Sequence, residues 1–113
     1  MQTLTSPEAL AAALADHPAV LVLFGGRHCG VCHALAPPLS AMLAEEFPRL
    51  RAFYVDCQGE AAALCAQQRV FSLPVVRLWF AGQPFDERGR VFALGEVREM
   101  IRRPYAALFG DGD

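Results

Sequence analysis

The feature that most constrains the fold is AVLVLF at residues 19–24, a run of apolar residues with no polar alternation. A strand with one face in water alternates apolar and polar residues, whereas a strand buried on both faces is apolar throughout. The run is far shorter than the ~20 residues that a membrane span needs. Gly25 and Gly26 end it. It therefore predicts a central strand of a sheet covered on both faces, as in α/β proteins.

The segments around this run predict alternating helices and strands. Ser6, Pro7 and Glu8 form a good helix start, with a hydroxyl cap, a proline in the first turn and an acid near the positive end. His17-Pro18 ends that helix. Further elements are expected at residues 32–47 (helix, kinked at Pro37 and Pro38), 50–56 (strand), 59–69 (helix), 74–80 and 85–92 (hairpin strands) and 94–108 (helix), with a flexible tail at 110–113. This order predicts one domain over residues 1–113, with a central mixed sheet of four to five strands flanked by helices on both faces.

A cysteine motif, Cys29-Gly30-Val31-Cys32, follows the central strand at the predicted start of a helix. Free backbone N–H groups and the helix dipole at such a position favour an anion, which lowers the pKa of a thiol. Cys32 lies one helical turn beyond Cys29, so their Cα atoms should fall within the ~4.4–6.8 Å that a disulfide requires. We therefore predict a catalytic dithiol, with Cys29 as the attacking thiolate and Cys32 as the resolving thiol.

Three basic side chains surround this motif. His28 and His33, when positively charged, would stabilise the Cys29 thiolate and so tune its pKa. Arg27 is either a third such cation or an exposed loop residue.

The same cysteines allow other interpretations. C-x-x-C-H, with His33 in last place, is the attachment motif of a c-type haem, but that use needs an export route, a distal ligand and a largely helical pocket. A structural zinc site usually supplies paired short spacings, which Cys57 and Cys65 do not provide, so we expect no metal site. Four cysteines in a cytosolic chain argue against structural disulfides. We expect Cys57 and Cys65 to be buried, inert thiols, with a second redox switch as the alternative.

From about residue 19 to residue 103 the sequence resembles thioredoxins. VLVLF, CGVC and the following AP resemble the family's strand, its C-G-P-C motif and its helix-kinking proline, which is matched by Pro37. FSLPVV resembles the segment with the cis-proline, which implies that Leu73 and a cis Pro74, with Gly30 and Val31, form the client groove. An extended client chain would then pair with the Leu73 backbone. VDCQGEAAALC also resembles a protein disulfide isomerase pattern whose second cysteine pair is structural, which implies the same for Cys57 and Cys65.

The chain departs from this family at several positions. His28 replaces a common tryptophan, and Val31 replaces proline. Leu23 and Ala52 stand where thioredoxins have a buried aspartate and its lysine partner. An apolar floor should raise the pKa of Cys32 by desolvation, so resolution is expected to be slower unless water or His33 carries the proton.

The resemblance implies a thiol–disulfide oxidoreductase that reduces disulfides of client proteins. It needs no bound cofactor beyond the Cys29–Cys32 disulfide and would receive electrons from a thioredoxin reductase-like donor. The alternative is a non-catalytic adaptor or redox sensor whose dithiol modulates partner binding, an alternative that Leu23 and Ala52 keep open.

Composition bounds the setting of the protein. A net charge of −2 gives no reason to expect a nucleic-acid or membrane partner. Arginine supplies every basic residue and alanine is abundant, which indicates a GC-rich, bacterial genome. Glu8 and Asp16 interrupt the first apolar stretch, and no cationic segment precedes it, so we expect a cytoplasmic protein. We also expect a monomer.

Overall fold

The five strands form one mixed sheet in the order β1-β3-β2-β4-β5, in a computed structural model that describes residues 1–110. The strands are β1 (Gln2–Thr3), β2 (Ala19–Gly25), β3 (Arg51–Asp56), β4 (Val75–Phe80) and β5 (Gln83–Gly89). The helices are α1 (Pro7–Asp16), α2 (Gly30–Glu46), α3 (Ala62–Gln67) and α4 (Leu94–Phe109). The α/β class, the mixed sheet and the central position of the apolar run are confirmed.

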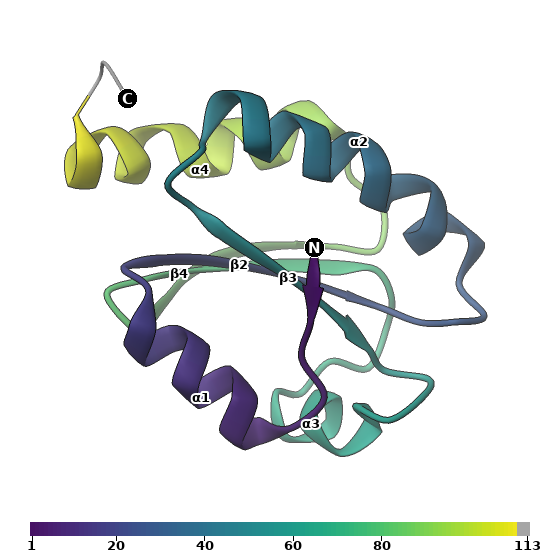
Figure 1. Ribbon diagram of the computed structural model, residues 1–113. Coiled ribbons are helices and arrows are strands. Elements are labelled where there is room, and N and C mark those ends of the chain that lie inside the picture. Colours follow the sequence, from purple (N-terminus) through teal and green to yellow (C-terminus); the bar gives the residue numbers. More distant parts are fainter. Residues whose placement is uncertain (111–113) are drawn as a thin grey trace.

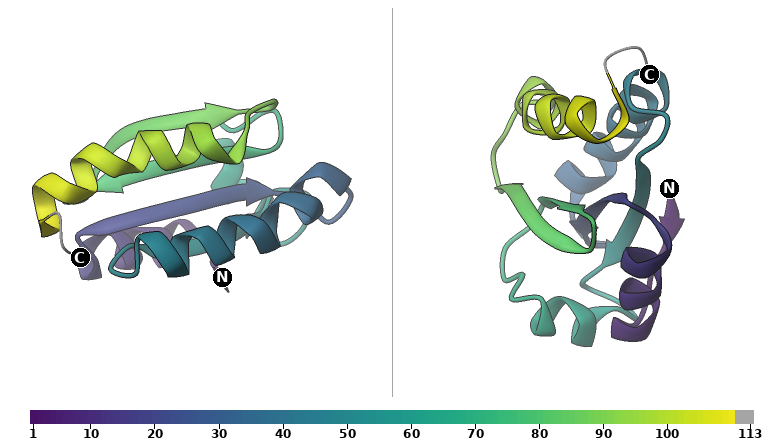
Figure 2. Two further views of the ribbon diagram at one scale, coloured as in Figure 1. Left: turned by 90° about the horizontal axis from the view of Figure 1, so that it is seen from above. Right: turned by 90° about the vertical axis from the view of Figure 1, so that its left-hand side faces the viewer.

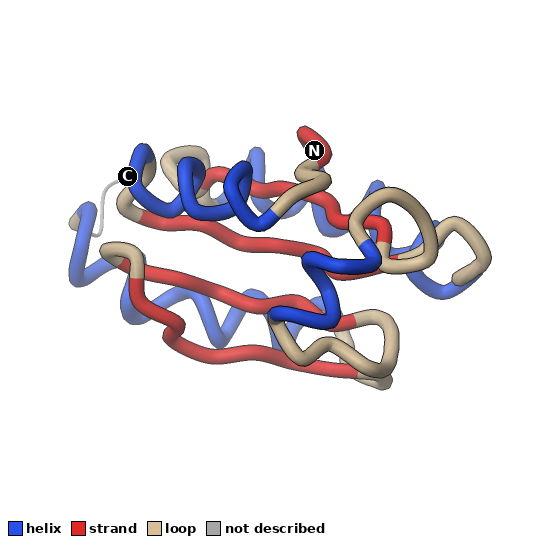
Figure 3. The backbone as a smooth tube through the Cα atoms, turned by 90° about the horizontal axis from the view of Figure 1, so that it is seen from below, coloured by secondary structure: helices blue, strands red, loops and turns tan. Residues whose placement is uncertain are grey.

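The helices cover both faces of the sheet, with α2 and α4 on one side and α1 and α3 on the other (Figure 1). The two views of Figure 2 show the same layers from above and along the sheet, and Figure 3 shows the strands side by side from below. Every residue of β2 is buried, and successive side chains enter opposite cores. Val20, Val22 and Phe24 pack with α1 and α3, whereas Leu21 and Leu23 pack with α2 and α4.

The strand register determines what surrounds the end of β2. β3 runs parallel to β2, with Gly25 opposite Asp56, and β4 runs antiparallel, with Phe24 opposite Val75. The end of β3 and the start of β4 therefore flank the point where β2 enters the cysteine motif. This edge is where an open α/β sheet commonly carries its chemistry.

Several element boundaries differ from the prediction. The helix expected at 59–69 is shortened to Ala62–Gln67, because residues 57–61 form turns that close on the end of β3. The hairpin strand expected at 85–92 is Gln83–Gly89, because the connection is a tight turn at Ala81-Gly82, both with positive φ. The two-residue β1 was not predicted. Helix α2 continues through Pro37 and Pro38, and the predicted tail at 111–113 lies outside the described residues.

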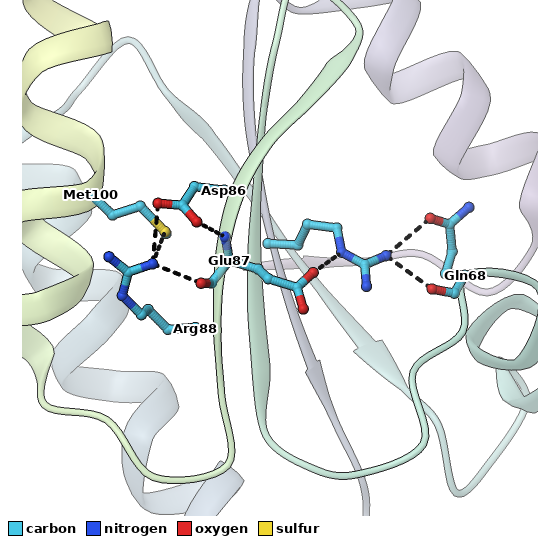
Figure 4. Close-up of polar contacts among 6 residues, drawn as sticks. Gln68, Asp86, Glu87, Arg88 and Met100 are labelled. Atoms are coloured by element: carbon cyan, nitrogen blue, oxygen red, sulfur yellow. Dashed lines mark hydrogen bonds and ion pairs between the residues drawn. The ribbon is translucent and has the colours of Figure 1, made fainter.

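One arginine ties α3 to the hairpin. Arg77 of β4 donates from Nε to Glu87 (2.8 Å) and from Nη1 to the Gln68 carbonyl (3.1 Å) and side-chain oxygen (3.2 Å). Its guanidinium also lies 5.3 Å from the Phe24 ring centroid, within cation–π range. Figure 4 shows Gln68 and Glu87 at either end of these contacts. Arg77 therefore holds the end of α3, from which the chain continues to Pro74.

Candidate functional site

The cysteine motif forms the first turn of α2, as predicted. Cys29 is the N-cap residue, and the Cys32 N–H donates to the Cys29 sulfur at 3.2 Å. A disulfide joins the two cysteines, whose Cα atoms are 5.3 Å apart. Cys29 is half-buried, whereas Cys32 is fully buried. A reachable sulfur that accepts a backbone N–H suits an attacking thiolate, and the hidden sulfur behind it suits resolution.

A second loop holds the motif from the side. Asp56, at the end of β3, accepts from the Arg27 N–H at 3.1 Å and from the Arg27 guanidinium at 3.0 Å. Gln58 accepts from the His28 N–H at 2.8 Å, and its own N–H donates to Asp56. The two residues before Cys29 are therefore fixed by the loop after β3. The Arg27 guanidinium is paired with Asp56 while its side chain stays largely exposed, and its effect on the Cys29 pKa stays a prediction.

The Asp56 carboxylate is stabilised as an anion. Burial alone would raise the pKa of Asp56, but hydrogen bonds from Arg27 and from the Gln58 backbone, together with the Arg27 charge, lower it below its ordinary value of 3.8. Asp56 is thus ionised at neutral pH, where it accepts the hydrogen bonds from Arg27 that hold the loop before Cys29.

The two histidines lie where the sequence places them, beside the motif. A ring nitrogen of His33 lies 3.2 Å from the Arg27 carbonyl oxygen, so His33 adds a third contact to the loop before Cys29. His28 is exposed and is held through its backbone. Their tuning of the Cys29 pKa stays a prediction.

The floor beneath the first turn of α2 is mainly apolar. Leu23 is fully buried and Ala52 is half-buried, at the positions where the resemblance places a buried aspartate and its lysine partner. Tyr54, opposite Leu23 on β3, places a buried hydroxyl here that has no hydrogen-bond partner among the described residues. Desolvation and the nearby Asp56 charge raise the pKa of Tyr54, and the Gly26 backbone, which lies outside hydrogen-bond geometry, offsets this only in part. A Cβ on Gly25 would lie 2.9 Å from two atoms of the Tyr54 ring, so this ring occupies the space of a side chain at position 25.

The proposed client groove begins at the other side of the motif. The Leu73–Pro74 peptide bond is cis, the geometry that the resemblance implies. The Pro74 carbonyl accepts from the Arg90 N–H at 2.7 Å, which brings the segment after β5 alongside. Val31 is 63% exposed, so the motif presents an apolar side chain to solvent.

The second cysteine pair corrects one expectation. Cys57 and Cys65 are not free thiols: they form a disulfide with a Cα–Cα distance of 5.6 Å. The expectation of free thiols was wrong because the turns at residues 57–61 fold α3 back, which brings Cys65 to Cys57 at the end of β3. A disulfide agrees with the cysteine pairing that the disulfide isomerase pattern implies, and its role as a structural link or a second redox switch stays a prediction. The Cys57 N–H also donates to the Gly25 carbonyl at 2.8 Å, so the disulfide anchors the loop that holds the motif.

Neither motif sulfur is available for a haem thioether in this state, since both belong to the disulfide. Within residues 1–110, no three histidine, cysteine or acidic side chains gather as metal ligands. No helix in that same span is long and apolar enough to cross a membrane.

Asp56, Gln58 and Tyr54 were missed by the sequence analysis. A signal for Asp56 was available, because it ends the strand predicted at 50–56, and a helix between two strands is typical of parallel neighbours whose carboxyl ends meet at one edge. The contacts of Gln58 and Tyr54 depend on loop and ring positions that no local pattern encodes.

Comparisons with known proteins agree with this geometry. The thioredoxin family model matches residues 2–102. The chain is 34% identical over 86 residues to "Thioredoxin-like 3-2, chloroplastic" of Arabidopsis thaliana, covering 73% of this chain but only 45% of the plant protein. It is 29% identical over 90 residues to "Thioredoxin Asp f 28" of Aspergillus fumigatus, covering 80% and 82% of the two chains. The X-ray structure of Fasciola hepatica thioredoxin superposes with a TM-score of 0.82 at 25% identity, covering 91% of this chain and 98% of the other.

Proposed function

Because the chain belongs to the thioredoxin family, whose members are thiol–disulfide oxidoreductases, we propose that it reduces disulfides of client proteins through Cys29 and Cys32. The observation that carries this proposal is the pairing of a half-buried sulfur at a helix N-cap with a fully buried sulfur one turn behind. The chain spans less than half of the plant relative's length, so the clients are inferred from this site alone.

The reaction follows from the positions of the two sulfurs. In the reduced protein, the Cys29 thiolate attacks one sulfur of a client disulfide, and the other client sulfur leaves as a thiolate. The buried Cys32, after losing its proton, attacks the Cys29 sulfur and releases the second client thiolate. The client gains two electrons, and the Cys29–Cys32 disulfide seen in the structure is the oxidised product. The Cys32 N–H stabilises the Cys29 thiolate before attack.

The remaining parts of the proposal extend beyond this chemistry. A thioredoxin reductase-like donor restores the dithiol, and no bound cofactor takes part. Leu73 and Pro74, together with Gly30 and Val31, receive an extended client strand through backbone hydrogen bonds. We place this activity in the bacterial cytoplasm, in a monomer.

Insulin-disulfide reduction with dithiothreitol as the electron source tests the proposal. Wild type should accelerate the reaction, and Cys29→Ser should abolish the acceleration. Cys32→Ser should accumulate mixed disulfides with insulin chains that a reductant releases, because no second thiol resolves them. Wild type that fails to accelerate reduction with any reductant would favour the adaptor function instead.

A further inference from the structure

Large apolar side chains lie exposed around the dithiol. Among the described residues, six large hydrophobic side chains are exposed: Met1, Val31, Phe71, Phe85, Val91 and Leu108. Three of the six belong to the segments that surround the disulfide: Val31 in the motif, Phe71 three residues before Pro74, and Val91 directly after Arg90. Single exposed apolar residues are ordinary, but several at one functional edge indicate a binding surface.

Phe71 and Val91 are the most exposed of the six, at 82% and 94%. The hydrogen bond between the Arg90 N–H and the Pro74 carbonyl, and the pairing of Gly89 with Val75, hold the Val91 segment beside the Pro74 segment. Phe71 lies on the loop between α3 and Pro74. Arg77 fixes the start of this loop, because its guanidinium donates to the Gln68 carbonyl. The Phe71 ring is therefore exposed to solvent on a loop held at one end by the Arg77–Gln68 contact and at the other by the Arg90–Pro74 hydrogen bond.

The same place carries an unused positive charge. Arg90 is exposed and has no ion pair within residues 1–110, and its φ of 67° lies in the left-handed region that non-glycine residues seldom adopt. Asp56, the acidic residue whose carboxylate contacts the motif loop, is already paired with Arg27. The surface beside Pro74 therefore combines exposed apolar side chains with Arg90, an arginine that forms no ion pair among the described residues.

We propose that this protein selects clients whose disulfide-bonded cysteine is flanked by a large apolar residue and an acidic residue, with Phe71 and Arg90 as the specificity-determining side chains. The apolar client side chain packs on Phe71 and Val91, and the client carboxylate pairs with the Arg90 guanidinium. This inference rests on the proposed function, because it names the clients of that same dithiol.

Short peptides in which one cysteine forms a mixed disulfide with thionitrobenzoate provide the probe. The Cys29 thiolate of the pre-reduced protein attacks the peptide sulfur and releases coloured thionitrobenzoate. Cys32 then releases the reduced peptide and leaves the Cys29–Cys32 disulfide. Three peptides are compared, which carry Phe and Glu, Phe and Arg, or Ser and Glu beside the cysteine. The mixed disulfide of glutathione with thionitrobenzoate serves as a general substrate.

The Phe/Glu peptide should react fastest with wild type. Phe71→Ser should slow both Phe-bearing peptides roughly fivefold and leave the Ser/Glu peptide unchanged, because only apolar burial is lost. Phe71→Leu should restore most of that rate. Arg90→Glu should slow the Glu-bearing peptides roughly threefold and speed the Arg-bearing one, an effect that fades with added salt.

Matched controls lie at the other end of the molecule. Phe85→Ser removes an exposed aromatic ring from β5, and Arg103→Glu reverses an exposed arginine of α4, and both should leave every peptide rate as in wild type. Equal rates for the three peptides, or Phe71→Ser and Arg90→Glu variants that match wild type on all of them, would overturn the selectivity while leaving the oxidoreductase intact. Wild type that reacts with no peptide and not with the glutathione substrate would overturn the proposed function itself.

Discussion

Replacing Cys57 and Cys65 with alanine removes the cross-link between the end of β3 and α3. The disulfide closes a loop with a sequence separation of eight residues. Loop-closure entropy for that length predicts a loss of about 2.5 kcal/mol in the free energy of unfolding. For a chain of 113 residues this loss corresponds to a fall of about 10 °C in Tm. Cys65 is only 3% exposed, so its missing sulfur adds up to ~1 kcal/mol of lost packing.

Guanidinium unfolding of the oxidised proteins, without reductant, measures this difference. Cys57→Ala alone should already lower the free energy of unfolding by nearly the full ~2.5 kcal/mol, because it breaks the disulfide. Adding Cys65→Ala should lower it by less than ~1 kcal/mol more. Thiol titration of the denatured proteins should find no free thiol in wild type and one in the single variant. If the single Cys57→Ala variant is as stable as wild type, or if wild type shows two free thiols beside an intact Cys29–Cys32 disulfide, the reasoning is refuted.

Two further predictions concern the residues around the motif. The pKa of Asp56 is lowered in the folded protein, so its stabilising contribution is complete above its ordinary value of 3.8 and is lost as the pH falls through its folded value. Asp56→Asn should therefore be less stable than wild type in urea unfolding at pH 7, with the gap closing in acid, and a gap that does not depend on pH would contradict the ion pair. Tyr54→Phe should raise the free energy of unfolding by about 1 kcal/mol, since it removes a buried hydroxyl without a partner. A loss of stability in the same urea assay would show that this hydroxyl is hydrogen-bonded.

The central strand and the motif were predictable because each is written in a short stretch of sequence. An apolar run of strand length is buried on both faces, which places it in the middle of a covered sheet, as β2 shows. A capped helix start at Ser6 needs only the residues that follow it, and the Ala9 N–H does donate to the Ser6 hydroxyl. The dithiol geometry of Cys29 and Cys32 likewise needs only one turn of helix.

Contacts between distant segments were decided by the tertiary structure. The pairing of Arg27 with Asp56 depends on the parallel register of β2 and β3, which brings together residues 29 positions apart. The Cys57–Cys65 disulfide depends on where α3 begins, and the placement of Arg90 beside Pro74 depends on the β4–β5 hairpin. Sequence patterns report the periodicity of single elements, whereas such contacts arise only when elements pack into one arrangement. For this protein, the sequence alone therefore determined that two cysteines stand one helical turn apart at the start of α2, and packing decided what holds the Cys29 sulfur in place and what surrounds it.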